Sequence, residues 1–158
     1  MPVSEDKMFC YLDDERDLIE LKGRLVRLGY QVPPGEWTRC FWPEEVIKLL
    51  QTNEIEILSL DHDLGDAVRA HRDNRLERTG IDVLNWLEKQ VFECGFKPPT
   101  HIFVHSMNPD GSRKMRQIVN RIQKKYKELN NGYSLIQNTR RMFRESRDTL
   151  SPRSLVGR

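Results

Sequence analysis

The sequence predicts an α/β fold in which a mainly parallel sheet lies between two layers of helices, as a three-layer sandwich. Short apolar runs at residues 8–12, 55–60 and 101–104 alternate with longer stretches of helical periodicity. Strands separated by helices pair in parallel through right-handed crossovers. Each run also ends in polar or acidic residues, and such sheets bind ligands at the carboxyl ends of their strands. The same pattern therefore predicts both the fold and the place of the site.

Local signals predict the elements of the first half. Residues 8–12 form a strand that stops at a run of charged residues, and leucines then repeat at helical spacing over residues 18–28. Residues 37–41 form a second strand after a Pro-Pro-Gly turn. A helix begins at Pro43, because the proline ring suits the first helical position, and residues 55–60 form the next strand.

The second half continues the alternation. A polar insertion at residues 67–78, which we interpret as an exposed segment and a candidate lid, precedes a helix that ends near Gly95. Residues 101–104 form a strand, and an amphipathic helix follows to about Leu129. A last short strand is expected at residues 133–137.

Length and composition predict one domain at residues 1–150 and a flexible tail at residues 151–158. No apolar run approaches the roughly 20 residues that cross a bilayer. The N-terminus lacks the basic and apolar regions of a secretory signal, so we expect a cytoplasmic protein. Cys10, Cys40 and Cys94 have no CxxC spacing, which argues against a disulfide framework or a zinc site, and we expect all three to be buried.

Charge is unevenly distributed along the chain. Residues 112–158 contain 13 Lys and Arg against 3 Asp and Glu, a net charge of +10. Because the whole chain carries +2, residues 1–111 carry −8. The basic third is either a solvated helix face and tail or a surface for phosphate groups, including the backbone of a nucleic acid.

Carboxylates collect at two of the strand ends. Asp13 and Asp14 follow the first strand, and Asp61 and Asp63 follow the strand at residues 55–60. Neighbouring carboxylates repel one another unless they share a cation or a proton. We therefore predict that these four acids bind Mg²⁺ or another divalent cation; the alternative for the cluster is that its acids hold raised pKa values. The alternative for any one of them is a local role as the cap of a helix or turn.

Two histidines stand at the same edge of the predicted sheet. Because imidazole titrates near neutral pH, we predict that His62 and His105 transfer protons and that Asp61 completes the catalytic group. Each such transfer is worth about 10² to 10⁴ in rate. His71 and His101 are expected to be structural.

Further polar residues are candidates for binding a phosphate. The turn that begins at Asn108 leads into a helix whose first N–H groups can bind an anion, with Arg113 beside them. Thr79 begins another helix in the same way. Ser106 and Arg16 complete the predicted substrate-binding set. For the turn residues, ordinary helix capping is the alternative.

Four segments together carry a resemblance to a known family. They are LDDER at 12–16, LDHDLG at 60–65, TGIDVL at 79–84 and HSMNP at 105–109. Across about residues 8–122 the sequence resembles the cyclic-phosphate-processing receiver-like domains, which are divergent relatives of response-regulator receiver domains. The resemblance implies a Rossmann-like, receiver-like sheet and a role in handling the cyclic-phosphate ends of nucleic acids.

By the same resemblance, the acidic pair at residues 13–14 matches the metal-binding pair of receivers, Asp61 matches the phosphoacceptor, and Ser106 falls near the hydroxyl that follows the fourth strand. Two features depart from the receiver pattern. His62 and Asp63 directly follow the matched phosphoacceptor, and no lysine stands at the end of a fifth strand. These departures argue against phosphorelay signalling and favour phosphoester hydrolysis.

The leading hypothesis is a metal-assisted phosphoesterase that acts on cyclic-phosphate ends of RNA or on a cyclic nucleotide, with the basic third holding the nucleic acid. The alternative is a noncatalytic receiver-like module that binds a nucleotide, a nucleic acid or a protein partner. Two further hypotheses are a phosphoaccepting switch at Asp61 and a nucleic-acid-binding protein that uses only the basic helix.

Overall fold

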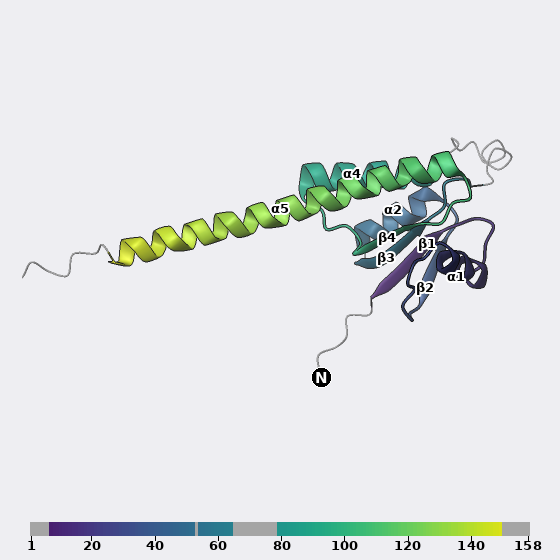
Figure 1. Ribbon diagram of the computed structural model, residues 1–158, viewed down its shortest axis with the longest axis horizontal. Helices are drawn as coiled ribbons and strands as arrows, with labels where there is room; N and C mark the ends of the chain where they lie inside the picture. Colours follow the sequence, from purple (N-terminus) through teal and green to yellow (C-terminus); the bar gives the residue numbers. More distant parts are fainter. Residues whose placement is uncertain (1–6, 53, 65–78, 150–158) are drawn as a thin grey trace, which may run out of the picture.

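Parallel strands lie at the centre of the protein (Figure 1), whose computed structural model describes residues 7–52, 54–64 and 79–149. Within these ranges a four-stranded sheet has the order β2-β1-β3-β4. Every neighbouring pair of strands is parallel. The strands are β1 (Met8–Leu12), β2 (Trp37–Cys40), β3 (Ile55–Leu60) and β4 (His101–Val104).

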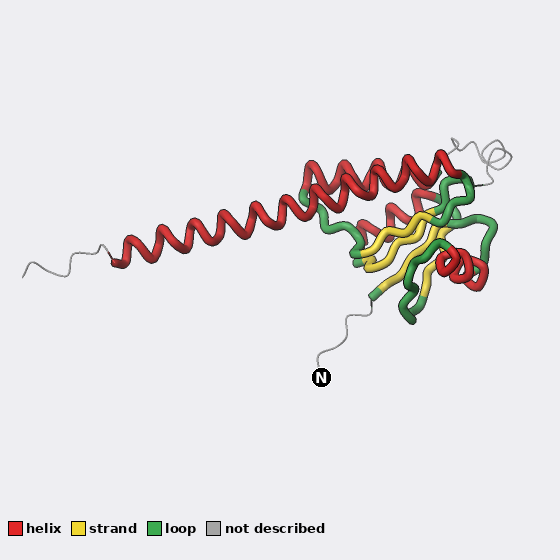
Figure 2. Tube along the Cα trace, in the orientation of Figure 1, coloured by secondary structure: helices red, strands yellow, loops and turns green. Residues whose placement is uncertain are grey.

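Helices cover both faces of the sheet, as Figures 1 and 2 show. On one face, α1 (Leu18–Arg27) buries Leu21 and Leu25 against the strands. On the other face lie α2 (Pro43–Thr52), α4 (Gly80–Cys94) and α5 (Pro109–Thr149). The predicted three-layer α/β sandwich with a parallel, receiver-like sheet is therefore confirmed.

The strands divide their side chains between two cores. Phe9 and Tyr11 of β1 pack with α1, whereas Cys10 and Leu12 pack with the helices of the opposite face. This alternation follows from the strand geometry, in which successive side chains point to opposite faces. Because both faces are covered, β1, β3 and β4 are mostly apolar and end where the sequence becomes polar, whereas the edge strand β2 contains Thr38 and Arg39.

α5 is a single helix of 41 residues, so the predicted strand at residues 133–137 is wrong. Leu129, Tyr133 and Ile136 recur four and three residues apart, which is helical spacing. A five-residue apolar segment is too short for its composition alone to separate a strand from a helix. The long helix also carries this segment away from the sheet, where no strand edge lies beside it (Figure 1).

α5 packs along α4 over its first turns. Met115 and Ile122 are fully buried in the core that the two helices share. On the surface of the same contact, the Arg121 guanidinium donates to both carboxylate oxygens of Glu88, at 2.8 and 3.2 Å. Beyond this contact, α5 continues past the end of α4 and away from the sheet (Figure 1).

The cysteine predictions are confirmed in part. Cys10 and Cys40 are buried on neighbouring strands, with their Sγ atoms 3.5 Å apart. Cys94 is exposed, so its predicted burial is wrong. It is the last residue of α4, and the two residues before it, Phe92 and Glu93, are exposed as well. The end of this helix has passed beyond the core.

Two sequence predictions lie outside the described residues, namely the insertion at 67–78 and the tail at 151–158. Among the helices that the structure does describe, none is both long enough and apolar enough to cross a bilayer.

Candidate functional site

The register of the sheet places three polar residues level with one another. Leu12 and Leu60 are register partners at the ends of β1 and β3. The backbone ladder then continues by one residue: the Asp61 N–H donates to the Leu12 carbonyl at 3.1 Å, and the His105 N–H donates to the Leu60 carbonyl at 3.0 Å. Asp13, Asp61 and His105 therefore share one edge, as the strand ends of a parallel sheet should.

A buried network joins the ends of β1 and β4. His105 Nε2 lies 3.1 Å from Asp13 Oδ2, and His105 Nδ1 lies 2.7 Å from Ser59 Oγ. Because a carboxylate only accepts, Nε2–H donates to Asp13, and in the neutral ring Nδ1 accepts from the Ser59 hydroxyl. All three side chains are buried. Both nitrogens of His105 are thus used inside the protein.

Arg16 bridges the two buried carboxylates. Its Nη1 donates to Asp13 Oδ2 at 3.0 Å and to Asp61 Oδ2 at 3.2 Å. The loop that carries it is fixed by Asp13 Oδ1, which accepts the backbone N–H groups of Glu15 and Arg16, both at 2.9 Å. The guanidinium offsets the repulsion between the two acids. Its side chain is 22% exposed, so this cation also reaches solvent.

The surroundings of Asp13 and Asp61 shift the pKa values of their carboxyl groups in opposite directions. Burial by itself opposes ionisation of Asp13, but hydrogen bonds from His105 and from the backbone of the following turn hold its pKa well below the usual range. Burial raises the pKa of Asp61, although the positive charge of Arg16 works against that shift. Asp13 is therefore the permanent anion of the site, and Asp61 takes up a proton more readily.

His62 and Asp63 form a second pair at the mouth of the cluster. His62 Nδ1 lies 2.6 Å from Asp63 Oδ1, and the Asn108 amide donates to the same oxygen at 3.5 Å. The His62 N–H donates to Asp61 Oδ1 at 2.8 Å, which ties the pair to the buried acids. Because Asp63 holds Nδ1–H, Nε2 is the basic nitrogen of this ring.

Two glycines allow the chain to approach the site closely. A Cβ atom at Gly80 would lie 2.0 Å from the Asp61 carbonyl oxygen, so α4 can begin against β3 only without a side chain there. A Cβ atom at Gly111 would lie 2.5 Å from Cγ of the His62 ring. The His62 ring therefore rests on the first turn of α5, which limits its orientations.

Four of the five predicted substrate-binding residues make local contacts in the structure, as caps of turns and helices or in an ion pair. Ser106 Oγ accepts the Asn108 N–H at 3.1 Å, and Asn108 Oδ1 accepts the Gly111 N–H at 3.0 Å. Thr79 accepts the Ile81 N–H in the capping box of α4. Arg113, exposed on α5, pairs with Asp110 at 2.9 Å. Of the five predicted residues, only Arg16 contacts the buried acids.

One group among the described residues has the geometry of a metal site. Asp13, Asp61 and His105 each offer one ligand atom, and these atoms lie within 4.8 Å of one another. Two carboxylates and an imidazole are a donor set that suits a divalent cation. Asp14 and Asp63, which the sequence predicts as ligands, are not members of this group. A cation bound there would compete with Arg16 for the same carboxylate oxygens.

Three residues that support the site are absent from the sequence predictions. Ser59 is the one fully buried polar residue of β3, and a buried hydroxyl needs a partner. That rule is a signal that sequence reasoning could have used. The side chain of Arg24 donates to the carbonyls of His105 and the next residue, both at 3.3 Å, and Arg39 donates to the Asp13 carbonyl at 3.0 Å. These arginine contacts have no sequence signal.

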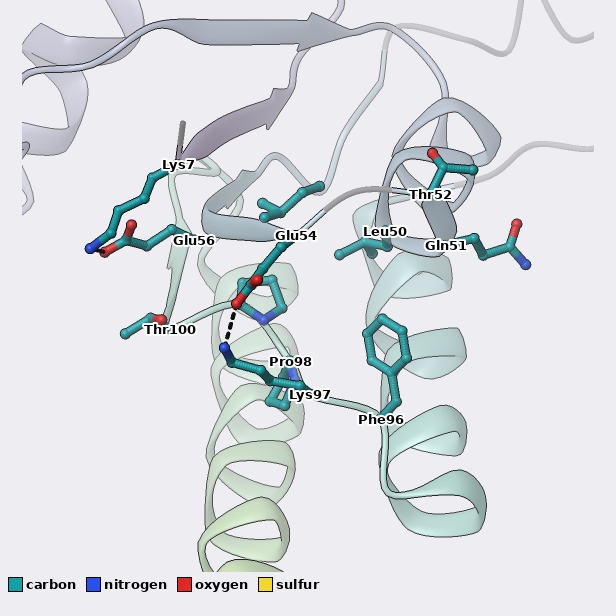
Figure 3. A pocket seen from close by; sticks show the side chains of 12 residues that line it. Lys7, Leu50, Gln51, Thr52, Glu54, Glu56, Phe96, Lys97, Pro98 and Thr100 are labelled. Carbon is teal, nitrogen blue, oxygen red and sulfur yellow. Dashed lines mark hydrogen bonds and ion pairs between the residues drawn. The ribbon is translucent and has the colours of Figure 1, made fainter. Parts of the chain in front are cut away.

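A separate hollow of about 630 Å³ lies at the opposite edge of the sheet (Figure 3). It forms beside the amino ends of β1 and β3 and the loop before β4, and none of the site residues lines it. Ion pairs between Lys7 and Glu56, at 3.3 Å, and between Lys97 and Glu54 lie at its rim. The hollow is therefore distinct from the titratable cluster of Asp13, Asp61 and His105, whose side chains are buried.

The family comparison agrees with this arrangement. A family model described as "Cyclic-phosphate processing Receiver domain" matches residues 8–121. The matched span begins at β1 and ends within α5, so it contains every residue of the buried cluster. No curated protein and no solved structure matches the chain.

Proposed function

The chain belongs to the cyclic-phosphate processing receiver domain family, and from this premise we propose that it is a metal-assisted phosphoesterase. Its proposed substrate is a 2′,3′-cyclic phosphate at an RNA end or in a cyclic nucleotide. The observation that carries the proposal is the convergence of Asp13, Asp61 and His105, whose ligand atoms lie within 4.8 Å of one another at the carboxyl edge of the sheet.

The donor set fits a hard or borderline divalent cation. Asp13 and Asp61 supply carboxylate oxygens, which suit Mg²⁺ and Mn²⁺, whereas the third member of the group, His105, has both ring nitrogens bonded to Asp13 and Ser59. When bound, such a cation supplies positive charge beside the phosphate and polarises its oxygens. The low pKa of Asp13 keeps this ligand ionised at neutral pH.

Arg16 is the proposed phosphate-binding side chain. Its guanidinium bridges Asp13 and Asp61 and is partly exposed, so it can turn from the carboxylates toward a phosphate without leaving the site. Guanidinium groups donate in a planar fork that matches phosphate oxygens. The same residue thus compensates the buried acids before substrate binds and contacts the substrate afterwards.

His62 is the proposed proton carrier. Asp63 holds the His62 ring through Nδ1, which leaves Nε2 to take the proton of the attacking water. As the oxygen of that water bonds to phosphorus, one ribose oxygen leaves, and His62 returns the proton to it. His105 has a different role: it is fully buried with both nitrogens bonded, so it positions Asp13.

The basic third of the chain is the proposed contact for a longer RNA. Arg113, Lys114 and Arg116 are exposed in the first turns of α5, which begins beside the His62 ring. Cations in this position can bind the phosphates upstream of the cyclic end. An RNA oligomer should therefore bind more tightly than a mononucleotide, and salt should remove the difference.

The proposal is tested by incubating the full chain with a nucleoside 2′,3′-cyclic phosphate and Mg²⁺, Mn²⁺ or Zn²⁺, and by separating the products chromatographically. We expect a phosphomonoester that forms only with the metal and disappears with chelator or in Asp61→Asn. Turnover that persists in chelator would overturn the metal role. Absence of turnover with every metal would overturn the esterase.

A second candidate function rests on the Arg16 bridge. Because Arg16 already pairs with Asp13 and Asp61, the two carboxylates share a counter-ion without a metal. This favours a noncatalytic module that binds a nucleotide, a nucleic acid or a protein partner. Calorimetric titration of the cyclic nucleotide separates the two candidates, since the module binds it and releases it unchanged.

A further inference from the structure

The second half of α5 projects from the rest of the protein. The helix has 41 residues, which at 1.5 Å per residue is a length of about 60 Å. Its first turns bury Met115, Val119 and Ile122 against the core. Figure 1 shows the remainder extending past the end of α4, beyond every strand of the sheet.

This projecting half exposes apolar side chains. Leu129 is 37% exposed, Met142 is 69% exposed and Phe143 is 66% exposed. Most of the stability of a helix in a protein comes from packing of an apolar face, because helix propensity alone is marginal in water. A projecting amphipathic helix therefore indicates a surface that packs against something else.

The apolar positions continue one repeat from the core to the projecting half. Along α5 they recur at alternating intervals of four and three residues, which is the heptad repeat of a left-handed coiled coil. The positions of this seam, all of them apolar or aromatic except Arg140, are Met115, Val119, Ile122, Tyr126, Leu129, Tyr133, Ile136, Arg140 and Phe143. The first three are buried within the protein, so the exposed stripe is the continuation of a face that already packs.

We propose that the projecting half of α5 pairs with the same segment of a second copy, antiparallel, to form a symmetric dimer. Around a two-fold axis near residue 134, position 129 lies opposite position 140 of the second copy, and position 133 lies opposite position 136. This pairing sets Arg140 beside Leu129. A parallel pair would instead stack the two copies of Arg140 on each other, at a cost in charge repulsion.

The residues that flank the seam also suit a second copy. Asn130, Gly132, Gln137 and Thr139 flank the central positions of the projecting half and are uncharged, whereas Arg144 flanks its last seam position. Two copies can therefore approach without like-charge repulsion along the central flanks, and the like-charged pairing of Arg144 with Lys125 of the second copy falls at the ends of the seam. The stripe is self-complementary in spacing.

A nucleic acid suits this segment less well. The basic side chains do not form one stripe: at 100° per residue, Lys124 and Arg140 lie about 160° apart around the helix. Two other cations are held against α4, where Arg121 pairs with Glu88 and Lys125 lies 5.2 Å from the Phe92 ring centroid. A phosphate backbone that followed the helix would meet a broken series of charges.

The test is sedimentation velocity of the full chain over a wide range of concentration, without nucleic acid. We expect a reversible monomer–dimer equilibrium. Leu129→Lys, which sets a second cation beside Arg140, and Phe143→Glu should each raise the dissociation constant at least ~10-fold. Met142→Glu is the matched control, because Met142 is as exposed as Phe143 but lies off the seam, and it should leave the equilibrium unchanged. Circular dichroism of each variant checks that the fold is retained.

A chain that stays monomeric at all concentrations would overturn the dimer, and so would an equal effect of Met142→Glu. If the monomer instead binds single-stranded RNA and loses it in Phe143→Glu, the occupant is a nucleic acid. Orientation is tested in a Cys94→Ser background by oxidising a mixture of Leu129→Cys and Arg140→Cys chains. A disulfide between the two variants supports the antiparallel pair, and one formed by Arg140→Cys alone contradicts it.

Discussion

His105 Nε2 lies 3.1 Å from Asp13 Oδ2, and neither side chain is exposed to solvent. The contact links the ends of β1 and β4 across β3, which lies between them in the sheet. It is therefore part of the folded core as well as of the site. The groups that a ligand can reach are the partly exposed ones, Arg16 and His62, with Asp61 behind them.

His105→Leu should destabilise the protein by about 2–4 kcal/mol. The change leaves a buried carboxylate and the Ser59 hydroxyl without the ring that bonds both of them. Urea unfolding at neutral pH measures the loss. His101→Gln is the matched control, because His101 is exposed, and it should change stability by less than about 0.5 kcal/mol. Equal stabilities would contradict the buried network.

Asp13 and Asp61 should give opposite pH dependences in chelator. The lowered pKa of Asp13 contributes stability that is complete well above about pH 3.9, the usual value for an unfolded Asp, and is lost as the pH falls below it. The raised pKa of Asp61 contributes stability below that pH, which is lost as the pH rises through its folded value.

Urea unfolding from pH 3 to 7 measures both effects. Asp13→Asn should flatten the rise of stability with pH, and Asp61→Asn should steepen it and stabilise the protein at neutral pH. If both substitutions changed the profile in the same direction, the assignment of Asp13 as the permanent anion would be wrong.

Arg16→Gln should tighten Mn²⁺ binding by ~10-fold, or about 1.4 kcal/mol. The guanidinium occupies the carboxylate oxygens of Asp13 and Asp61 that a cation would use, so its removal ends the competition. Calorimetry with Mn²⁺ provides the measurement. Arg39→Gln is the control, because the side chain of Arg39 bonds to the backbone carbonyl of Asp13 and to neither carboxylate of the cluster. Weaker binding in Arg16→Gln would show that the cation does not use these oxygens.

Gly80→Ala should cost at least about 2 kcal/mol, because the new methyl group would meet the Asp61 carbonyl oxygen at 2.0 Å. Gly23→Ala provides the contrast. Gly23 lies in α1 with open space around it, so the alanine should stabilise by about 0.5–1 kcal/mol. Thermal unfolding of the two variants should shift in opposite directions, and a tolerated Gly80→Ala would mean that α4 begins farther from β3.

The sequence allows the strands and the meeting of Asp13, Asp61 and His105 to be predicted, because each strand end combines an apolar run with an abrupt polar stop. The roles of the two histidines could not be separated in this way. Which ring is buried depends on the face to which it points and on its partners, Ser59 and Asp63, and these are properties of the packed structure.

The contacts of Arg16 and the full length of α5 could not be predicted from the sequence either. The position of Arg16 depends on a loop conformation that Asp13 fixes through backbone hydrogen bonds, so the sequence identifies the residue but not its bridge. In α5, the sequence of residues 133–137 is compatible with a strand or a helix. Only the continuation of the helical spacing of apolar residues from the preceding part of α5 favours a helix.

The most direct test of the account follows a nucleoside 2′,3′-cyclic phosphate by ³¹P NMR in the presence of the full chain and Mn²⁺. The account predicts conversion to a phosphomonoester by the wild-type chain, and a rate ~10²- to 10⁴-fold lower in a folded His62→Gln variant. A cyclic phosphate signal that stays unchanged with the wild-type chain, or the same rate in both proteins, would contradict it.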